Sequence, residues 1–293
     1  MARLIRVVLF LVASFTCLFA GIPDPPATAS PPTGHGYWLA GADGGVFSFG
    51  GAQFYGSTGS LVLQRPIVGI AATPDRLGYW LVASDGGVFT FGDASYYGSV
   101  PGLGIAPAGT VLSGPALTAP IVGIIPSPDG RGYLLIGADG GVFAFGDATY
   151  EGSCYQVPCG SNTAVAAAVA DKTGNGYWFL MTNGTSYNFG DASPSCSVPP
   201  QTVPVTSASG PGNSVTYDYL FANGWALDCG NTFFGSAFGQ LAPGDKATAI
   251  VLDDNDDYWI VTARGAVFAF GVANYGSMAG TYLNAPIVGA AGW

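Results

Sequence analysis

Short apolar runs separated by turn residues fill most of this chain, and one unit of them recurs. The clearest copy is PIVGIAATPDRLGYWLVASDGGVFTFGDASYYGS, residues 66–99. Its apolar runs predict strands at 67–72, 79–84 and 88–91, with a short fourth strand near 96–99. The runs are continuous rather than alternating, which is typical of sheets covered on both faces.

The unit occurs six times. A tyrosine marks the same position in each copy: Tyr37, Tyr79, Tyr133, Tyr177, Tyr217 and Tyr258. A turn pair follows each tyrosine: Asp43-Gly44, Asp85-Gly86, Asp139-Gly140, Asn183-Gly184, Asn223-Gly224 and Arg264-Gly265. Asp-Gly and Asn-Gly are the strongest signals for a two-residue hairpin, because both central residues must accept positive φ. Tandem units of this length form β-sheet repeats.

The first copy lacks its opening strand, because the Pro-rich stretch before Tyr37 cannot form one. The missing strand recurs at the other end, as Pro286-Ile287-Val288-Gly289-Ala290. An open array would leave unpaired edge strands. The sequence therefore predicts an all-β fold over residues 37–293: a six-bladed β-propeller closed by the C-terminal strand, in which 287–289 pairs with 37–40.

The first residues read as an export signal. Arg3 and Arg6 precede an apolar run over 7–20, which is too short to span a bilayer comfortably. Residues 1–29 are predicted to be a signal peptide, cleaved after Ala20 or Ala29, and 30–36 a short tether. We expect a protein that is secreted, extracellular or cell-wall associated, with no membrane span after signal removal.

Composition fits one ring of short strands and limits the partners. The chain has 46 Gly, 21 Pro and 9% charged residues, with a net charge of −10. Nucleic acid is a poor partner for so acidic a chain, and a monomer is expected. The acids gather at turns that topology places on one face: Asp75, Asp93, Asp129, Asp147, Asp171, Asp191 and the run 253–257. Asp is a common turn residue, which explains much of this charge.

Four cysteines remain after export, and an even number in an oxidising compartment favours disulfides. Cys154 and Cys159 flank a short loop, so their local pairing is favoured, with Cys196 and Cys229 forming a second bridge between blades. Buried free thiols are the alternative. The spacing does not indicate zinc.

The unit GYWLVASDGGVFTFGDASYYGS resembles the tandem repeat of secreted actinobacterial proteins, whose function is often unassigned. The resemblance extends over 36–293 and implies a propeller built of repeats. It implies no activity. The Asp-box order of sialidase-type propellers is met only in part by Ser84-Asp85-Gly86-Gly87.

Catalytic residues are not predicted. The single histidine, His35, lies in the tether, and the aspartates sit at recurrent turn positions. Trp38, Trp80, Trp178 and Trp259 follow the marker tyrosines, which favours core packing over sugar stacking. Trp225 and Trp293 fall outside this register and are the candidates for exposed aromatic contacts.

One turn has the pattern of a metal site. Asp253, Asn255 and Asp257 have the alternate spacing of oxygen ligands in a calcium loop, and calcium is the one possible cofactor. The following glycine and bidentate glutamate of such loops are missing, so an acidic tight turn is the alternative.

The leading functional interpretation is a secreted, non-catalytic module that binds a cell-envelope protein or glycan. Its ligand-binding residues are unknown, with the links at 100–119 and 154–159 as candidate loops. The alternatives are a propeller hydrolase or lyase using clustered Asp and calcium, and a purely structural surface protein.

Overall fold

The computed structural model describes residues 34–110, 114–160, 163–193, 198, 202–210, 217–230 and 233–293. The chain divides into two units, 1–30 and 31–293, and all the described residues belong to the second. The predicted signal peptide and most of the predicted tether lie outside the described residues. Strand β1 already begins at Gly36.

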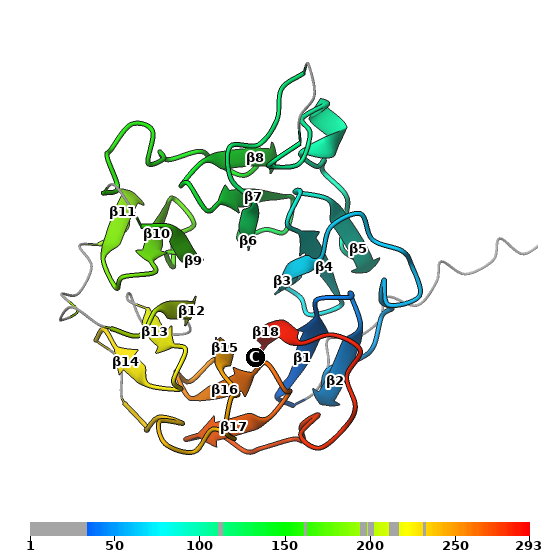
Figure 1. Cartoon of the computed structure of the whole chain (residues 1–293), viewed down its shortest axis with the longest axis vertical. Coiled ribbons are helices and arrows are strands. Elements are labelled where there is room, and N and C mark those ends of the chain that lie inside the picture. The colour runs from blue at the N-terminus through cyan, green and yellow to red at the C-terminus, as the bar shows by residue number, and fades with distance from the viewer. Residues whose placement is uncertain are drawn as a thin grey trace, which may run out of the picture. The chain divides into compact units, whose positions relative to one another are not determined.

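Six three-stranded antiparallel sheets are present in the described residues of the second unit, arranged about a central axis (Figure 1). The inner strands are β3 (Ile67–Ala72), β6 (Ile121–Pro126), β9 (Val165–Ala170), β12 (Val205–Ser209), β15 (Ala247–Leu252) and β18 (Ile287–Gly292). The middle strands are β1 (Gly36–Gly41), β4 (Gly78–Ala83), β7 (Gly132–Gly137), β10 (Gly176–Met181), β13 (Asp218–Phe221) and β16 (Tyr258–Thr262). The outer strands are β2 (Val46–Gly50), β5 (Val88–Gly92), β8 (Val142–Gly146), β11 (Ser186–Gly190), β14 (Ala226–Asp228) and β17 (Val267–Phe270).

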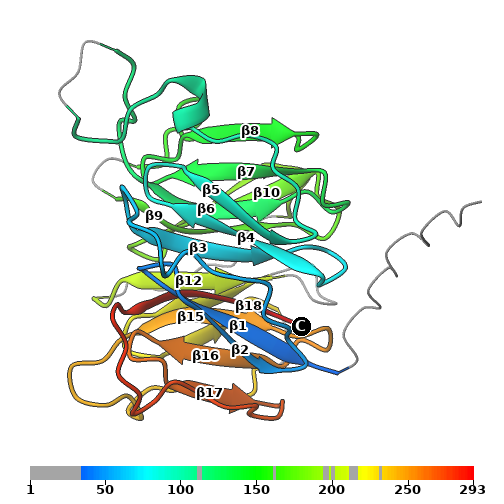
Figure 2. The ribbon, with the colours of Figure 1, turned by 90° about the vertical axis from the view of Figure 1, so that its right-hand side faces the viewer.

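Small residues form the inner strands because these strands converge. Each inner strand contacts the inner strand on either side, and Figure 2 shows the sheets stacked against one another in side view. Sequences such as IVGIAA and VAAAVA keep the side chains short at this meeting point. Every residue of the middle strands is buried, because neighbouring sheets cover both of their faces.

The last strand completes the first sheet. Strand β18 pairs antiparallel with β1, with Ala40 opposite Gly289 and Leu39 opposite Ala290. The predicted pairing of 287–289 with the first unit is confirmed. Ile287 is fully buried there, as Ile67 and Ile121 are at the corresponding positions of β3 and β6.

The predicted fourth strand is wrong. Residues 96–99 form no strand, and the sheet to which they belong has only three. A side chain of the next sheet takes the hydrogen bonds that a fourth strand would have used. The hydroxyl of Tyr133 donates to the Gly98 carbonyl at 2.6 Å and accepts from the amides of Tyr97 and Gly98 at 3.2 and 3.1 Å.

This tyrosine contact recurs around the structure. The marker tyrosine of one sheet donates its hydroxyl proton to the glycine carbonyl that follows the outer strand of the sheet before it. The pairs are Tyr37–Gly276, Tyr79–Gly56, Tyr133–Gly98, Tyr177–Gly152 and Tyr258–Gly235. All five glycines adopt a positive φ, between 129° and 139°, so an L-residue would be strained at any of them.

The recurrent tryptophans belong to the core, as predicted. Trp38, Trp80, Trp178 and Trp259 are at most 1% exposed. Each indole N–H donates to a backbone carbonyl of its own unit: Gln53, Ser95, Ser193 and Ala273 respectively. These four rings are therefore not accessible for stacking on a sugar.

Trp293 is buried, so the prediction of an exposed aromatic contact at this residue is wrong. It is 4% exposed, its ring centroid lies 4.9 Å from that of Trp38, and its indole N–H donates to the Gly34 carbonyl at 2.8 Å. The end of β18 places it against the first sheet, which the sequence register could not indicate. Trp225 is half-buried and stacks on Phe221 at 5.0 Å.

The tyrosine contact can be tested by removing one hydroxyl. Tyr79→Phe leaves the Gly56 carbonyl and the Tyr55 amide without their partner in a part-buried site, so we expect a loss of about 1–3 kcal/mol in the free energy of unfolding. Urea unfolding measures it. The matched control is Tyr96→Phe. Tyr96 is 56% exposed and its hydroxyl donates to the Ser99 hydroxyl of its own segment, so this change should alter stability by less than about 0.5 kcal/mol. Equal losses in the two variants would contradict the role of the contact.

Alkaline pH tests the same contacts together. Burial raises the pKa of Tyr37, Tyr79, Tyr177 and Tyr258 to about 12. The folded hydroxyls keep their protons where an unfolded tyrosine, with a pKa of about 10, loses them. Their stabilisation is therefore complete below about pH 10 and is lost as the pH rises toward 12. Urea titrations across this range should show a stable free energy of unfolding followed by a steep fall, with a shallower fall for Tyr79→Phe. A free energy of unfolding that stays constant up to pH 12 would argue against stabilisation by these protonated hydroxyls.

Candidate functional site

The central cavity has a volume of about 460 Å³ and is lined by all six inner strands. Its walls are mostly backbone and small apolar side chains. Four hydroxyl residues line it from β12 and β15, Thr206, Ser207, Ser209 and Thr248, and Thr73 lines it from the turn after β3. Two of these hydroxyls join neighbouring sheets, because Ser207 and Ser209 accept from the amides of Ile250 and Leu252 at 3.4 and 3.1 Å. The middle of the cavity thus offers little to orient a polar substrate.

Polar side chains gather at one mouth of this cavity. Arg76, from the turn after β3, forms a two-pronged ion pair with Asp254, from the turn after β15, at 2.8 and 2.6 Å. The guanidinium also lies over the ring of Trp293, 5.4 Å from its centroid. Arg76 therefore connects the second and sixth sheets across the sheet that contains β18 and β1. Partial exposure of both side chains limits the strength of this pair.

His35 also lies at this mouth of the central cavity and contacts its residues. Its Nδ1 lies 3.1 Å from the carbonyl oxygen of Trp293 and 3.5 Å from Oδ2 of Asp253. The sequence predicts this histidine to lie in a tether, and the structure instead brings it to β18 and the turn after β15. The imidazole is engaged with backbone and one carboxylate.

Aspartates on the turns after the inner and outer strands meet in pairs on this side, which we call the turn face. Thr73 bonds Asp75, and Thr173 joins Asp171 to Asp191. Burial, together with the neighbouring Asp75, raises the pKa of Asp93. A cleft of about 250 Å³ contains Asp129 and Asp147, yet the backbone amide of Arg131 helps to lower the pKa of Asp129. A general acid needs the opposite shift.

The predicted calcium residues share one turn, but the carboxylate of Asp253 is already hydrogen-bonded to backbone amides. Oδ1 of Asp253 accepts from the amides of Asn255 and Asp257 at 2.8 and 3.0 Å, and its side chain is 2% exposed. Burial and the charges of Asp253 and Asp256 raise the pKa of Asp257. Within the described ranges, no group of three or more His, Cys, Asp or Glu side chains is arranged to hold a metal ion. Calcium at this turn stays a prediction.

The opposite side, which we call the hairpin face, carries the hairpin turns and the links between units. Four of the links begin with a backbone hydrogen bond to their own hairpin glycine: Thr58 to Gly44, Val100 to Gly86, Cys154 to Gly140 and Met278 to Gly265. A turn follows that bond at once and presents apolar side chains to solvent. We call these exposed side chains the apolar crown: Leu61, Val62, Leu103, Tyr155, Val157, Phe238 and Tyr282.

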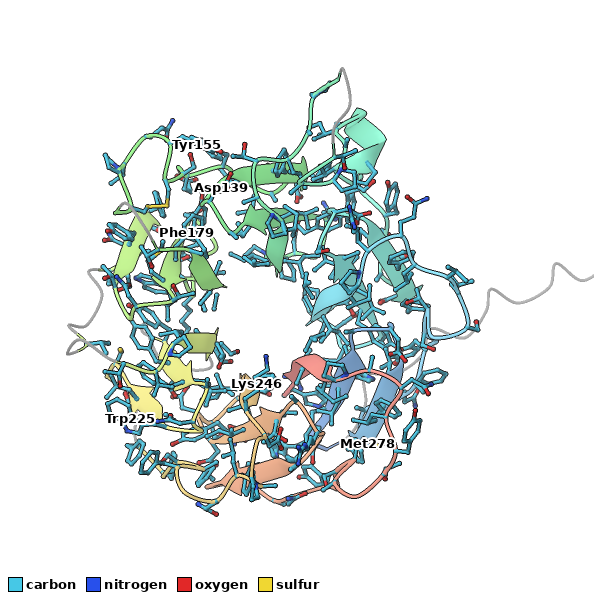
Figure 3. The ribbon with its side chains drawn as sticks, viewed as in Figure 1. Asp139, Tyr155, Phe179, Trp225, Lys246 and Met278 are labelled. Carbon is cyan, nitrogen blue, oxygen red and sulfur yellow. A yellow bond between two sulfur atoms is a disulfide. The ribbon has the colours of Figure 1, made fainter. Side chains whose placement is uncertain are left out.

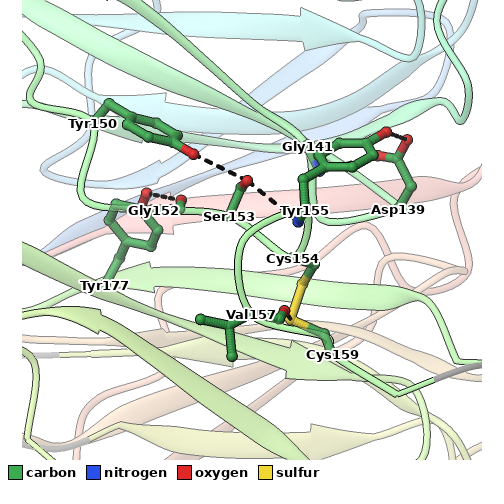
Figure 4. The surroundings of a disulfide bond; sticks show 10 residues. All are labelled: Asp139, Gly141, Tyr150, Gly152, Ser153, Cys154, Tyr155, Val157, Cys159 and Tyr177. Atoms are coloured by element: carbon green, nitrogen blue, oxygen red, sulfur yellow. Dashed lines mark hydrogen bonds between the residues drawn. A yellow bond between two sulfur atoms is a disulfide. The ribbon is translucent and has the colours of Figure 1, made fainter.

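A disulfide fixes one part of the crown (Figure 4). Cys154 and Cys159 are bonded as predicted, with their Cα atoms 5.2 Å apart. Tyr155 lies within the closed loop, and its hydroxyl donates to Oδ2 of Asp139 in the adjacent hairpin at 2.7 Å. The loop is held at two points, so Tyr155 and Val157 are presented with little freedom. Cys196 lies outside the described residues, and its pairing with Cys229 stays a prediction.

The longer link at 100–119 also belongs to the hairpin face. A short 3₁₀ turn, η1 (Pro101–Leu103), carries Leu103, and Ala106 bridges to Ala116 farther along. Residues 111–113 of this link lie outside the described residues. The prediction that this link and the 154–159 loop belong to one face agrees with their anchoring at Gly86 and Gly140.

Sequence reasoning missed the crown and the ion pair of Arg76. Phe238, Tyr282 and Val62 follow different residues, so no shared motif marks them. The available signal was weaker: each link has an apolar residue within a few positions of its anchor. The partner of Arg76 lies 178 positions away and could not be found from spacing.

Comparison with known proteins supports the fold. No protein-family model and no curated protein matches the chain. A chain in the crystal structure of a nidogen–laminin complex aligns with a TM-score of 0.57 and 10% identity, covering 88% of this chain and 98% of that one. A structural genomics protein of unknown function from Bacteroides thetaiotaomicron has a TM-score of 0.47, with 14% identity over 87% of this chain and 69% of its own. U3-55K has 0.45, with 13% identity over 74% and 64%.

Identities this low show the fold alone, and only the first score is high enough to support it. Together with the six antiparallel sheets, it defines the class as an all-β protein with a β-propeller-like repeat fold. In the part of the chain that the structure describes, no helix is long and apolar enough to cross a membrane.

Proposed function

We propose that this chain is a secreted, non-catalytic binding module that uses its hairpin face to bind a partner at the cell envelope. The observation that supports this most is the apolar crown. Seven of the thirteen large exposed apolar side chains among the described residues belong to it, and the other six lie in the segments that follow the outer strands. Exposed apolar side chains that lie together are typical of an interaction site. Five of the links contribute to it.

The opposite face supports the same assignment by contrast. Its aspartates bond to neighbouring threonines and backbone amides, as their recurrent turn positions require. The crown side chains have no comparable structural duty, apart from the hydroxyl of Tyr155. Side chains that serve no packing purpose and still recur on the links are better explained by a partner.

Export is proposed on two grounds. The leader at 1–29 has the charge and apolar pattern of a signal peptide, and a disulfide between Cys154 and Cys159 is typical of oxidising compartments. Membership of the actinobacterial repeat group remains a proposal that rests on the repeat pattern. The raised pKa of Asp93 beside Asp75 is too little to favour a hydrolase or lyase using clustered Asp and calcium, and no contact described above favours a purely structural surface protein.

We also propose that the six sheets form a closed propeller, with β18 as a full member of the first blade. The pairing of β18 with β1 and the contacts of β18 with both β3 and β15 support closure. The ion pair between Arg76 and Asp254 spans the same place.

If the propeller is closed, β18 should contribute as much to the free energy of unfolding as the inner strands of the other sheets do. Ile287→Ala should lower the free energy of unfolding by about 2–5 kcal/mol, the usual cost of such a cavity. Ile67→Ala and Ile121→Ala are matched controls, since all three side chains are fully buried at equivalent positions. Urea unfolding compares them. A much smaller cost for Ile287→Ala than for its two counterparts would mean that the ring is not closed by this strand.

Envelope binding can be tested by sedimentation with cell envelopes from the organism that makes the protein. The double variant Val62→Ser, Phe238→Ser removes apolar surface from two separate links of the crown. We expect at least about tenfold weaker retention, because buried apolar anchors dominate interface energy.

The matched control is Phe54→Ser, Phe233→Ser, which changes side chains 58% and 53% exposed, against 62% for Phe238, in the segments that follow the outer strands. This control should be retained like the wild type. Equal retention of all three proteins, or no retention of the wild type, would reject binding through the hairpin face.

A further inference from the structure

The sixth unit departs from the repeat at two positions, and both changes introduce a cation. The residue that opens the inner strand is Lys246, where the other units have Pro66, Pro120, Ala164, Pro204 and Pro286. The first hairpin residue is Arg264, where the others have Asp43, Asp85, Asp139, Asn183 and Asn223. The hairpin at Arg264 keeps the geometry of the others, since Gly265 has a φ of 77° and Gly140 likewise.

The carboxylate of Asp245 bonds to the backbone of both basic residues. Oδ1 of Asp245 accepts from the amide of Lys246 at 2.9 Å and from the amide of Arg264 at 3.2 Å. The amide of Ala263 also donates to the Lys246 carbonyl at 2.8 Å. The two basic residues thus leave adjacent backbone segments. Asp245 offsets one of their charges, which leaves a net charge of about +1 by formal count.

The cations of the two faces differ in their partners. On the turn face Arg76 pairs with Asp254, and Arg131 lies 3.8 Å from Asp129. On the hairpin face neither Lys246 nor Arg264 forms an ion pair with any residue that the structure describes. In a chain with a net charge of −10, Lys246 and Arg264 are thus adjacent cations without an ion pair among the described residues.

These cations border a groove with an apolar wall. The groove has a volume of about 920 Å³ and is lined by Lys246 and Arg264 on one side and by the link at 279–286 on the other. Tyr282 of that link is 87% exposed, and Leu283 and Pro286 complete the wall. Figure 3 shows Lys246 beside the inner end of its sheet, with Met278, which begins the link, farther out.

We propose that this groove is the docking site for an acidic polypeptide segment of a partner protein. Carboxylates of the segment would pair with Lys246 and Arg264, and an apolar side chain beside them would pack on Tyr282 and Leu283. This inference rests on the proposed binding function of the hairpin face and names the chemistry of its partner.

Residue type favours a polypeptide over an anionic glycan. Tyrosine and arginine are among the residues enriched at the energetic centres of protein interfaces. Arginine is suited to carboxylates because its planar fork can donate two parallel hydrogen bonds. A glycan carboxylate would satisfy the cations, but would leave the leucine and proline wall without an apolar counterpart. The net negative charge of the chain works against unspecific binding of any anion.

The test is selection from a displayed library of random dodecapeptides on the exported protein, with affinities of the enriched peptides measured by fluorescence anisotropy. We expect the enriched peptides to combine Asp or Glu with an aromatic or aliphatic residue. Binding should weaken at least about fivefold in the double variant Lys246→Gln, Arg264→Gln, and should weaken with added salt.

The matched control is Arg131→Gln, Lys172→Gln, which removes the same formal charge from the turn face. Its affinity for the enriched peptides should stay within about twofold of the wild type. Equal weakening in both double variants would mean that overall charge alone is responsible, and would overturn the site. Enriched peptides without carboxylates would overturn it as well.

Two further comparisons distinguish a failure of the groove proposal from a failure of the proposed binding function of the hairpin face. Peptides that bind the Lys246→Gln, Arg264→Gln variant normally but lose affinity for Val62→Ser, Phe238→Ser would reject the groove and keep the hairpin face. Peptides insensitive to both variants, or no enrichment at all, would reject the groove as a peptide site, while the envelope sedimentation with Val62→Ser, Phe238→Ser still decides on the hairpin face. Oligogalacturonate serves as a carboxylate glycan: binding of this probe that depends on Lys246 and Arg264, in the absence of acidic peptides, would assign the groove to glycans instead.

Discussion

The structure depends on one recurrent contact, the hydroxyl of a buried tyrosine bonded to a glycine carbonyl of the preceding sheet. Each sheet has its own backbone ladder, and a backbone hydrogen bond joins it to the next sheet, as from the Ile121 amide to the Ser84 carbonyl at 2.9 Å. Side-chain contacts determine the rest of how one sheet lies against the next. A hydroxyl that donates to Gly98 and accepts from its amide fixes both distance and register at one point. The rings around it supply apolar area, since Tyr133 packs on Phe145 and Trp80.

The same contact explains why part of the fold could be predicted from the sequence and part could not. Hairpins, strand order and the pairing of β18 with β1 follow from local turn chemistry and from counting repeats. The segment at 96–99 resembles a fourth strand because it is aromatic, a composition shared by strands and by cores. Only the structure reveals that its amides bond to Tyr133 instead of to another strand. The burial of Trp293 escapes prediction for a similar reason, because its neighbours Trp38 and Gly34 lie at the far end of the sequence.

The two faces differ in whether the repeat accounts for their side chains, a difference that the acidic composition of the chain does not reveal. Asp75 and Asp171 are explained by the turns in which they sit, so the charge of the turn face is largely a by-product of the repeat. Residues that the repeat does not require are more informative. The crown side chains and the Lys246–Arg264 pair are of this kind, and both lie on the hairpin face. Arg264 is visible in the sequence as the one exception among the hairpin pairs, but only its neighbour Lys246 and the groove give that exception a meaning.

The shared first sheet has a consequence for the order of assembly. Strand β1 obtains its inner partner from residues 287–292, so the first sheet cannot be completed until those residues have been synthesised. Contacts between such distant residues are slow to form, because a long loop must close before they contribute. Until then β1 presents an unpaired edge, whereas the other five sheets are each made of three strands consecutive in the sequence.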